Sequence, residues 1–177
     1  DGVHLKGNKI PITLLGTEPL LSNTKIMYDY IPVDEIYDKG QKVAYPNLCG
    51  YQDDFMYSMR RFLKGDEDML GTVTGMIRRK RDLVANVNFI TNYYGFTLND
   101  LVSYDVKHNE DNGEDNRDGA DYNYSWNCGV EGKTKKAGII SLRKKMIKNA
   151  LLLVFLSQGT PLINAGDEFC NSQNGNN

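Results

Sequence analysis

The apolar residues of this chain fall into short segments of two alternating kinds, and this alternation is the strongest constraint on its fold. Segments of one kind are rich in β-branched and aromatic residues and are typical of strands, whereas the others repeat apolar residues at helical spacing. Strands are predicted over residues 24–30, 84–91 and 162–165, the last short and buried, and helices over residues 53–64, 67–80 and 138–157. The order strand, helix, strand, helix, strand favours a parallel α/β sheet or barrel.

Two of these helices carry clear polarity along their length. Residues 53–64 begin with Asp53 and Asp54 and have basic residues near the end, which suits the helix dipole. Residues 138–157 carry Arg143 and three lysines in the first half, whereas the second half is almost wholly apolar. We therefore expect the start of this helix to be exposed to solvent and its end to be buried against a sheet layer.

Composition excludes several classes of protein. The chain has 177 residues and a net charge of −2, so no nucleic-acid or anionic-membrane partner is predicted. Its longest apolar run, residues 150–156, is far shorter than the roughly 20 residues of a membrane helix. Cys49, Cys128 and Cys170 fit no zinc motif and indicate reduced thiols in a cytoplasmic protein. Both ends look cut, so we expect a piece of a longer protein.

A long polar segment separates the last two predicted elements. A segment such as residues 105–136 is usually functional or disordered, and Trp126 with several tyrosines argues against disorder. Residues 105–123 contain seven acidic residues, but their spacing does not match a calcium-binding EF-hand. His108 has no second His or Cys near it. We therefore expect a hydrogen-bonded surface loop, and we expect neither a bound metal nor a cofactor.

In parallel α/β folds, functional side chains lie at the carboxyl ends of the strands. At the predicted ends stand His4 and Lys6, then Asp29, then residues 92–95 (NYYG), and finally residues 167–168 (DE). Asp29 is the carboxylate whose place suits acid–base catalysis. The alternative is that Asp29 only caps the end of its strand.

The second half of the chain closely resembles glycoside hydrolase family 13, in its isoamylase, pullulanase and glycogen-debranching branch. The resemblance is nearly continuous from about residue 86 to the end and is looser before it. It is carried by residues 87–91 (VNFIT), 95–104 (GFTLNDLVSY), 107–110 (KHNE), 112–119 (NGEDNRDG), 126–132 (WNCGVEG), 156–161 (LSQGTP) and 165–169 (AGDEF).

This resemblance implies the fold and the chemistry. The family's catalytic domain is a TIM-type (β/α)8 barrel, and the chain would be its C-terminal half, from the end of strand 4 through strand 8. Residues 1–177 would then form one partial catalytic-barrel domain, since a whole barrel takes about 250 residues. The family's reaction is retaining hydrolysis of glycosidic bonds, which uses a carboxylate nucleophile and a carboxylic acid about 5 Å apart.

At the family's catalytic positions, however, this chain carries other residues. Lys6 stands at the position of the nucleophile, and His4 replaces the arginine that orients it. Asp29 stands at the position of the general acid, one methylene shorter than the usual glutamate, and Tyr30 follows it in place of proline. Tyr94 replaces the third carboxylate. Lys6 cannot form the glycosyl ester and places a positive charge beside an oxocarbenium-like transition state.

These departures lead to three hypotheses about function. The first is a catalytically inactive relative of the debranching enzymes that serves as a glucan-binding or regulatory module. The second is an active α-1,6-glucosidase that uses atypical residues or residues outside this segment. The third is structural: a half barrel exposes strand edges and an apolar face, so we expect a homo-oligomer that covers them.

The resemblance also indicates a ligand, an α-glucan such as glycogen or a branched dextrin. Tyrosines near the strand ends could stack on sugar rings, or they could instead fill space left by lost polar residues. The candidate substrate-binding residues are His4, Tyr30, Tyr93, His108 and Asn109.

Overall fold

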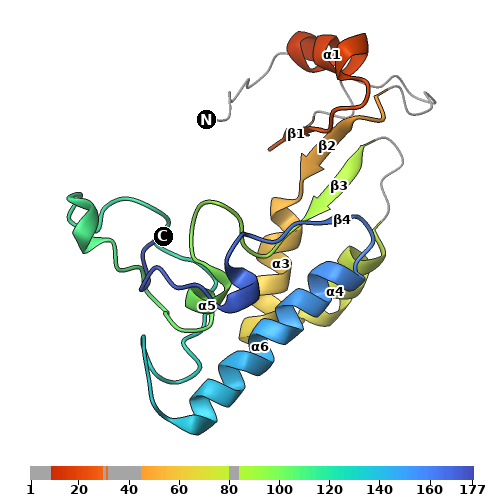
Figure 1. The fold of residues 1–177 in the computed structure, drawn as a ribbon. Coiled ribbons are helices and arrows are strands. Elements are labelled where there is room, and N and C mark those ends of the chain that lie inside the picture. The colour runs from red at the N-terminus through yellow and green to blue at the C-terminus, as the bar shows by residue number, and fades with distance from the viewer. Residues whose placement is uncertain (1–8, 30, 32–44, 80–83) are drawn as a thin grey trace.

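The computed structural model describes residues 9–29, 31, 45–79 and 84–177, and these residues form a parallel sheet flanked by helices (Figure 1). The four strands of this described part lie in the sheet in chain order. They are β1 (Ile26–Tyr28), β2 (Leu48–Tyr51), β3 (Ala85–Asn88) and β4 (Thr160–Pro161). The parallel sheet with intervening helices confirms the predicted α/β class and is consistent with part of a (β/α)8 barrel.

The helices gather at two ends of the sheet. α3, α4 and α6 form one group, whereas α1 lies apart from them beyond the sheet (Figure 1). The helices are α1 (Lys9–Thr17), α3 (Asp53–Lys64), α4 (Met69–Arg78), α5 (Leu98–Leu101) and α6 (Ala137–Leu156). Short 3-10 turns occur at Pro19–Leu21, Glu110–Asn112 and Asp167–Phe169.

The predicted helices are confirmed within two residues at each end. α3 has the predicted bounds, because two aspartates occupy its first turn and Gly65 ends it. Gly65 adopts a φ of 95°, a conformation that costs glycine little, and its N–H bonds to the carbonyls of Arg61 and Phe62. The strand prediction over residues 24–30 is confirmed in its centre, as β1, and the prediction over residues 84–91 is confirmed in its first half, as β3.

The predicted strand over residues 162–165 is wrong. The strand lies earlier, at Thr160–Pro161, where it pairs with Val87 and Asn88 of β3. β3 ends at Asn88, and the N–H of Leu162 makes the last bond to it, at 2.9 Å from the Asn88 carbonyl. The following residues have no described strand to pair with, and Ile163 is 42% exposed instead of buried.

Gly159 makes the close approach of these two strands possible. It has a φ of 133°, and a Cβ atom at this position would lie 2.8 Å from the Asn88 Nδ2. The glycine therefore allows the chain to leave α6 and enter the sheet directly beside β3.

Besides β4, three elements, α1, α5 and β2, lie outside the predicted ranges. β2 has the sequence LCGY, which shows no alternation of polar and apolar residues. It is nevertheless a strand because it pairs on both sides, with β1 and with β3. Its first three residues are also buried. A strand whose two faces are both covered needs no alternation of polar and apolar residues.

Buried apolar side chains form two clusters. The larger one lies among α3, α4, α5 and α6 and includes Phe55, Val73, Phe96 and Ile147. The smaller one lies on the α1 side of the sheet and is formed by Ile12, Ile31, Leu48 and Val84.

The prediction for the long helix is confirmed for Lys144, Lys145 and Lys148, which are exposed, but it is wrong for Arg143 and for the end of the helix. Arg143, in the half predicted to be wet, is only 8% exposed, whereas Leu156, in the half predicted to be buried, is 72% exposed. The reason is geometric. α6 buries one face through Ile147, Ala150 and Val154, and no other element in the described part of the chain packs over its opposite face.

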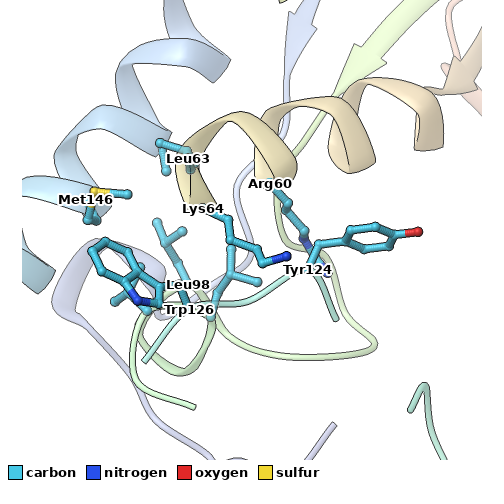
Figure 2. A pocket seen from close by; sticks show the side chains of 10 residues that line it. Arg60, Leu63, Lys64, Leu98, Tyr124, Trp126 and Met146 are labelled. Carbon is cyan, nitrogen blue, oxygen red and sulfur yellow. The ribbon is translucent and has the colours of Figure 1, made fainter. Parts of the chain in front are cut away.

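The long polar segment is tied to the helices by buried side chains. Arg60 of α3 donates from Nη1 to the Asn123 carbonyl at 3.1 Å and from Nε to the Ile90 carbonyl at 2.8 Å. Trp126 lies against Met146 and near Leu98, between α3 and α6 (Figure 2). The cavity drawn there has a free volume of only about 10 Å³, about enough for one water molecule. It is a packing gap rather than a ligand site.

Candidate functional site at the strand ends

The parallel strands bring the residues that follow them to one edge of the sheet. Asp29 follows β1 directly, and Asp53 follows β2 after one residue and opens α3. Tyr93 and Tyr94 lie five and six residues after the end of β3. The sequence prediction placed Asp29, Tyr93 and Tyr94 at such an edge, and the structure adds Asp53.

A cavity of about 250 Å³ opens between the ends of β1 and β2. Three carboxylates line it, and the remaining wall is formed by the end of β2 and two apolar side chains. The lining residues are Asp29, Ile31, Gly50, Tyr51, Gln52, Asp53, Asp54 and Val84. The cavity is therefore negatively charged and adjoins the two tyrosines.

The carboxylates and tyrosines of this edge act on one another electrostatically. Partial desolvation, with the negative charges of Asp29 and Asp54, raises the pKa of Asp53 above its usual range. Desolvation also raises the pKa of Tyr94, and the charges of Asp53 and Asp29 raise it further. Burial raises the pKa of Tyr51, with smaller contributions from Tyr93 and Asp29. These couplings place Asp29, Asp53 and Tyr94 in one electrostatic neighbourhood.

Arg79 fixes the α3 side of the cavity. Its guanidinium forms an ion pair with Asp54, including a hydrogen bond of 3.0 Å to Oδ1, and donates to the Gln52 Oε1 at 3.0 Å. Asp54 is therefore engaged by a cation. Asp29 and Asp53 line the same cavity, and we take them as the candidates for contact with a ligand.

The two adjacent tyrosines are exposed rather than packed. Tyr93 is 72% exposed and Tyr94 is 52% exposed, and their rings meet edge to face with centroids 5.0 Å apart. The hypothesis that tyrosines fill space left by lost polar residues does not describe this pair. Tyr28, by contrast, packs against the smaller apolar cluster, and its hydroxyl has no hydrogen-bond partner in the described part of the chain.

Several predicted site residues cannot be placed at this edge. Lys6, His4 and Tyr30 lie outside the described residues.

His108 and Asn109 lie in the long polar segment, where their contacts are structural. Asn109 is fully buried, donates from Nδ2 to the Asn177 Oδ1 at 2.8 Å, and accepts at Oδ1 from the Asn177 N–H at 2.8 Å. The His108 Nε2 lies 3.3 Å from the Glu131 Oε1. Glu131 also accepts from the backbone N–H of Asp105 at 2.9 Å. The geometry favours a role in loop structure over the predicted contact of Asn109 with substrate.

Asp167, which follows β4, is likewise used inside the protein. It is buried, accepts a hydrogen bond from the Thr91 hydroxyl, and accepts another from the Leu98 N–H at 2.9 Å. This carboxylate joins the ends of β3 and β4, which is a structural role.

Asp53 is the candidate residue that sequence reasoning missed. Its position in residues 53–64 suggested only a charge at a helix N-terminus. The signal that could have found it is its place immediately after residues 48–51, which become visible as a strand only once β1 and β3 are known to flank them.

Other kinds of site are absent from the described part of the chain. No group of three or more His, Cys, Asp or Glu side chains there is arranged to hold a metal ion. Within the same residues, no helix has the length and apolar character to span a membrane. Cys49 and Cys128 are buried, Cys170 is exposed, and all three are free thiols.

Comparison with known proteins gives relatives from one functional group. The chain is 40% identical over 174 residues to a "Glycogen operon protein GlgX homolog" of Mycobacterium tuberculosis. It is 36% identical over 185 residues to "Isoamylase 3, chloroplastic" of Oryza sativa, and 38% identical over 173 residues to the "Glycogen debranching enzyme" of Erwinia tasmaniensis.

These alignments cover most of this chain but only part of each relative. They span 93%, 100% and 92% of the chain and 24%, 24% and 26% of the three relatives, in the same order. The chain therefore spans about a quarter of the length of the curated relatives it matches. No protein-family model matches it.

Proposed function

We propose that this chain, a homologue of the isoamylase and glycogen debranching proteins of glycoside hydrolase family 13, is a part of a catalytic barrel that binds α-glucan without hydrolysing it. The predicted resemblance to that branch is confirmed by the names and identities of the relatives. The barrel segment is the C-terminal half, strand 4 to strand 8, as one partial domain over residues 1–177. Its support is the parallel sheet with strands in chain order.

The observation that carries the proposal is the strand-end cluster of Asp29, Asp53, Tyr93 and Tyr94. The exposed tyrosines offer flat apolar faces with polar tips, which suit a sugar ring. Carboxylates at the adjoining cavity can accept hydrogen bonds from sugar hydroxyls. Tyr94 nevertheless stands where the family has its third carboxylate, and Asp29 stands where the family has a longer acid.

Removing both tyrosine rings is expected to weaken glucan binding. A Tyr93→Ala/Tyr94→Ala variant should bind maltoheptaose at least about tenfold more weakly, because aromatic side chains that a ligand covers contribute a large share of the binding energy. Isothermal titration calorimetry measures this, with affinity electrophoresis in glycogen as a second readout. Tyr122→Ala is the matched control, since Tyr122 is an exposed tyrosine of the polar segment. Absence of binding by the unmodified chain at millimolar maltoheptaose would overturn the proposal.

A second candidate function, hydrolysis with atypical residues, is favoured by one observation. Asp53 and Asp29 line the same cavity, and desolvation together with the charge of Asp29 raises the pKa of Asp53. Retaining hydrolysis uses two carboxyl groups at one site, one as the nucleophile and one as the acid. An assay on branched dextrin distinguishes the two functions, as described in the Discussion.

The apolar surface of α6 supports self-association, the structural hypothesis. Leu152, Phe155 and Leu156 are exposed beside a groove of about 260 Å³ that also includes Phe62 and Ile77. A second copy that covers this face would remove apolar area from water. Light scattering is expected to give a dimer or larger species, and Leu152→Lys/Leu156→Lys should shift it to monomer. A monodisperse unmodified monomer would contradict self-association.

A further inference from the structure

A second cavity, of about 240 Å³, lies beside the first half of α6 and shares no residue with the strand-end cavity. Its wall contains three basic residues, Lys133, Arg143 and Lys144, together with hydroxyl groups that include those of Ser103 and Thr134. The described residues that line it include no carboxylate. Its charge is therefore opposite to that of the strand-end cavity.

Arg143 is a buried cation without a carboxylate partner in the described part of the chain. Its guanidinium donates to the carbonyls of Gly132 at 2.7 Å and Asn127 at 2.9 Å, and also to Val130. Its Nε has no hydrogen-bond partner among the described residues. Burying a charge without a counter-ion is costly, so an anion in the adjoining cavity would stabilise this arrangement.

The surrounding sequence adds positive charge and no negative charge. Residues 132–166 contain seven Lys and Arg residues and no Asp or Glu. Lys133 and Lys144 are exposed, and the described residues form no ion pair with either. An unneutralised cluster of this kind raises the local concentration of anions.

Two carboxylates act electrostatically on Tyr104 of the cavity wall, but both are engaged elsewhere. Asp100 accepts from the Ser172 hydroxyl at 2.6 Å and from a backbone N–H. Glu131 accepts from the backbone N–H groups of Asp105 and Val106 and from Asn127. Neither lines the cavity, so neither neutralises the lysines directly.

We propose that this cavity binds a small phosphate-bearing ligand. Lys133 and Lys144 would hold the phosphate as point charges, and the hydroxyls of Ser103 and Thr134 would donate to its oxygens. Tyr104 and Ile140 form an apolar part of the wall that suits the ring of a phosphorylated sugar. This site is independent of the proposed glucan-binding function, because its residues and its charge are different.

Calorimetric titration of the 177-residue chain with three probes tests the proposal. Inorganic phosphate and glucose 6-phosphate are expected to bind, whereas glucose should give no binding heat at the same concentration. Affinity should fall as salt is raised, since exposed cations carry the contact. Stronger binding of glucose 6-phosphate than of inorganic phosphate would support a role for the apolar wall, and equal binding would support a site that recognises the phosphate group alone.

A pair of double variants separates this site from general surface charge. Lys133→Ala/Lys144→Ala should weaken phosphate binding at least about tenfold, since it removes both exposed lysines of the wall. Lys145→Ala/Lys148→Ala removes the same charge from exposed positions of α6 that do not line the cavity, and it should leave affinity unchanged. Equal weakening by the two variants, or absence of binding by the unmodified chain to either phosphate probe, would overturn the proposal.

Discussion

The 177-residue chain is expected to release no reducing sugar from glycogen or from a branched dextrin. The resemblance places Lys6 at the nucleophile and Tyr94 at the third carboxylate, and neither side chain can supply the negative charge that an oxocarbenium-like transition state requires. Removal of a catalytic nucleophile costs on the order of 10⁶ in rate. A reducing-sugar assay measures this, on the chain and on any longer polypeptide that carries it, with an active isoamylase run in parallel.

If the chain does hydrolyse glucan, substitutions in the strand-end cluster will show which residues are responsible. Turnover that is lost in both Asp29→Asn and Asp53→Asn would show that two carboxylates of this cluster carry the chemistry. The second candidate function would then replace the first. Asp66→Asn is the matched control, because Asp66 pairs with Arg61 and Lys64 near the end of α3, away from the cavity.

Replacing Phe55 by alanine is expected to destabilise the fold more than any other single truncation in α3. Phe55 is fully buried and belongs to the large apolar cluster among the helices. Truncating a buried Phe to Ala costs about 3–5 kcal/mol, a large fraction of the roughly 5–15 kcal/mol by which a domain is stable. Urea unfolding followed by circular dichroism measures the loss as a lower midpoint.

Phe62→Ala provides the matched control for this variant. Phe62 is in the same helix and is the same residue type, but it is 37% exposed and lines the apolar groove of α6. Its loss should cost less than half as much in the free energy of unfolding. Equal effects of the two substitutions would contradict the assignment of the core to the Phe55 face of α3.

The helices show how far local sequence determines structure in this chain. α3 has its predicted bounds because each boundary is marked locally, by two aspartates at the start and by Gly65 at the end. β2 has no such signal: residues 48–51 are a strand only because two other strands donate and accept hydrogen bonds beside them. β4 lies at residues 160–161 instead of the predicted 162–165 for the same reason, since its position depends on where β3 ends.

The candidate site shows the same division. The carboxyl-end rule and the family resemblance identified Asp29, Tyr93 and Tyr94 from sequence. Asp53 was missed because its neighbour across the cavity, Asp29, is 24 residues away along the chain, and the sequence does not state that β1 and β2 are adjacent. Arg143 was predicted to be exposed from its charge, yet it is buried, and loop carbonyls around it accept hydrogen bonds from its Nη1 and Nη2.

By itself, the sequence determined the α/β class, the helices α3, α4 and α6, and the relationship to the debranching proteins, because periodicity, caps and motifs are local properties of the chain. The tertiary structure alone decided which strands pair, which face of α6 is covered, and which charges share a cavity. These depend on contacts between segments that are far apart along the chain, and only packing brings such segments together. The negative strand-end cavity and the positive cavity beside α6 are both products of that packing.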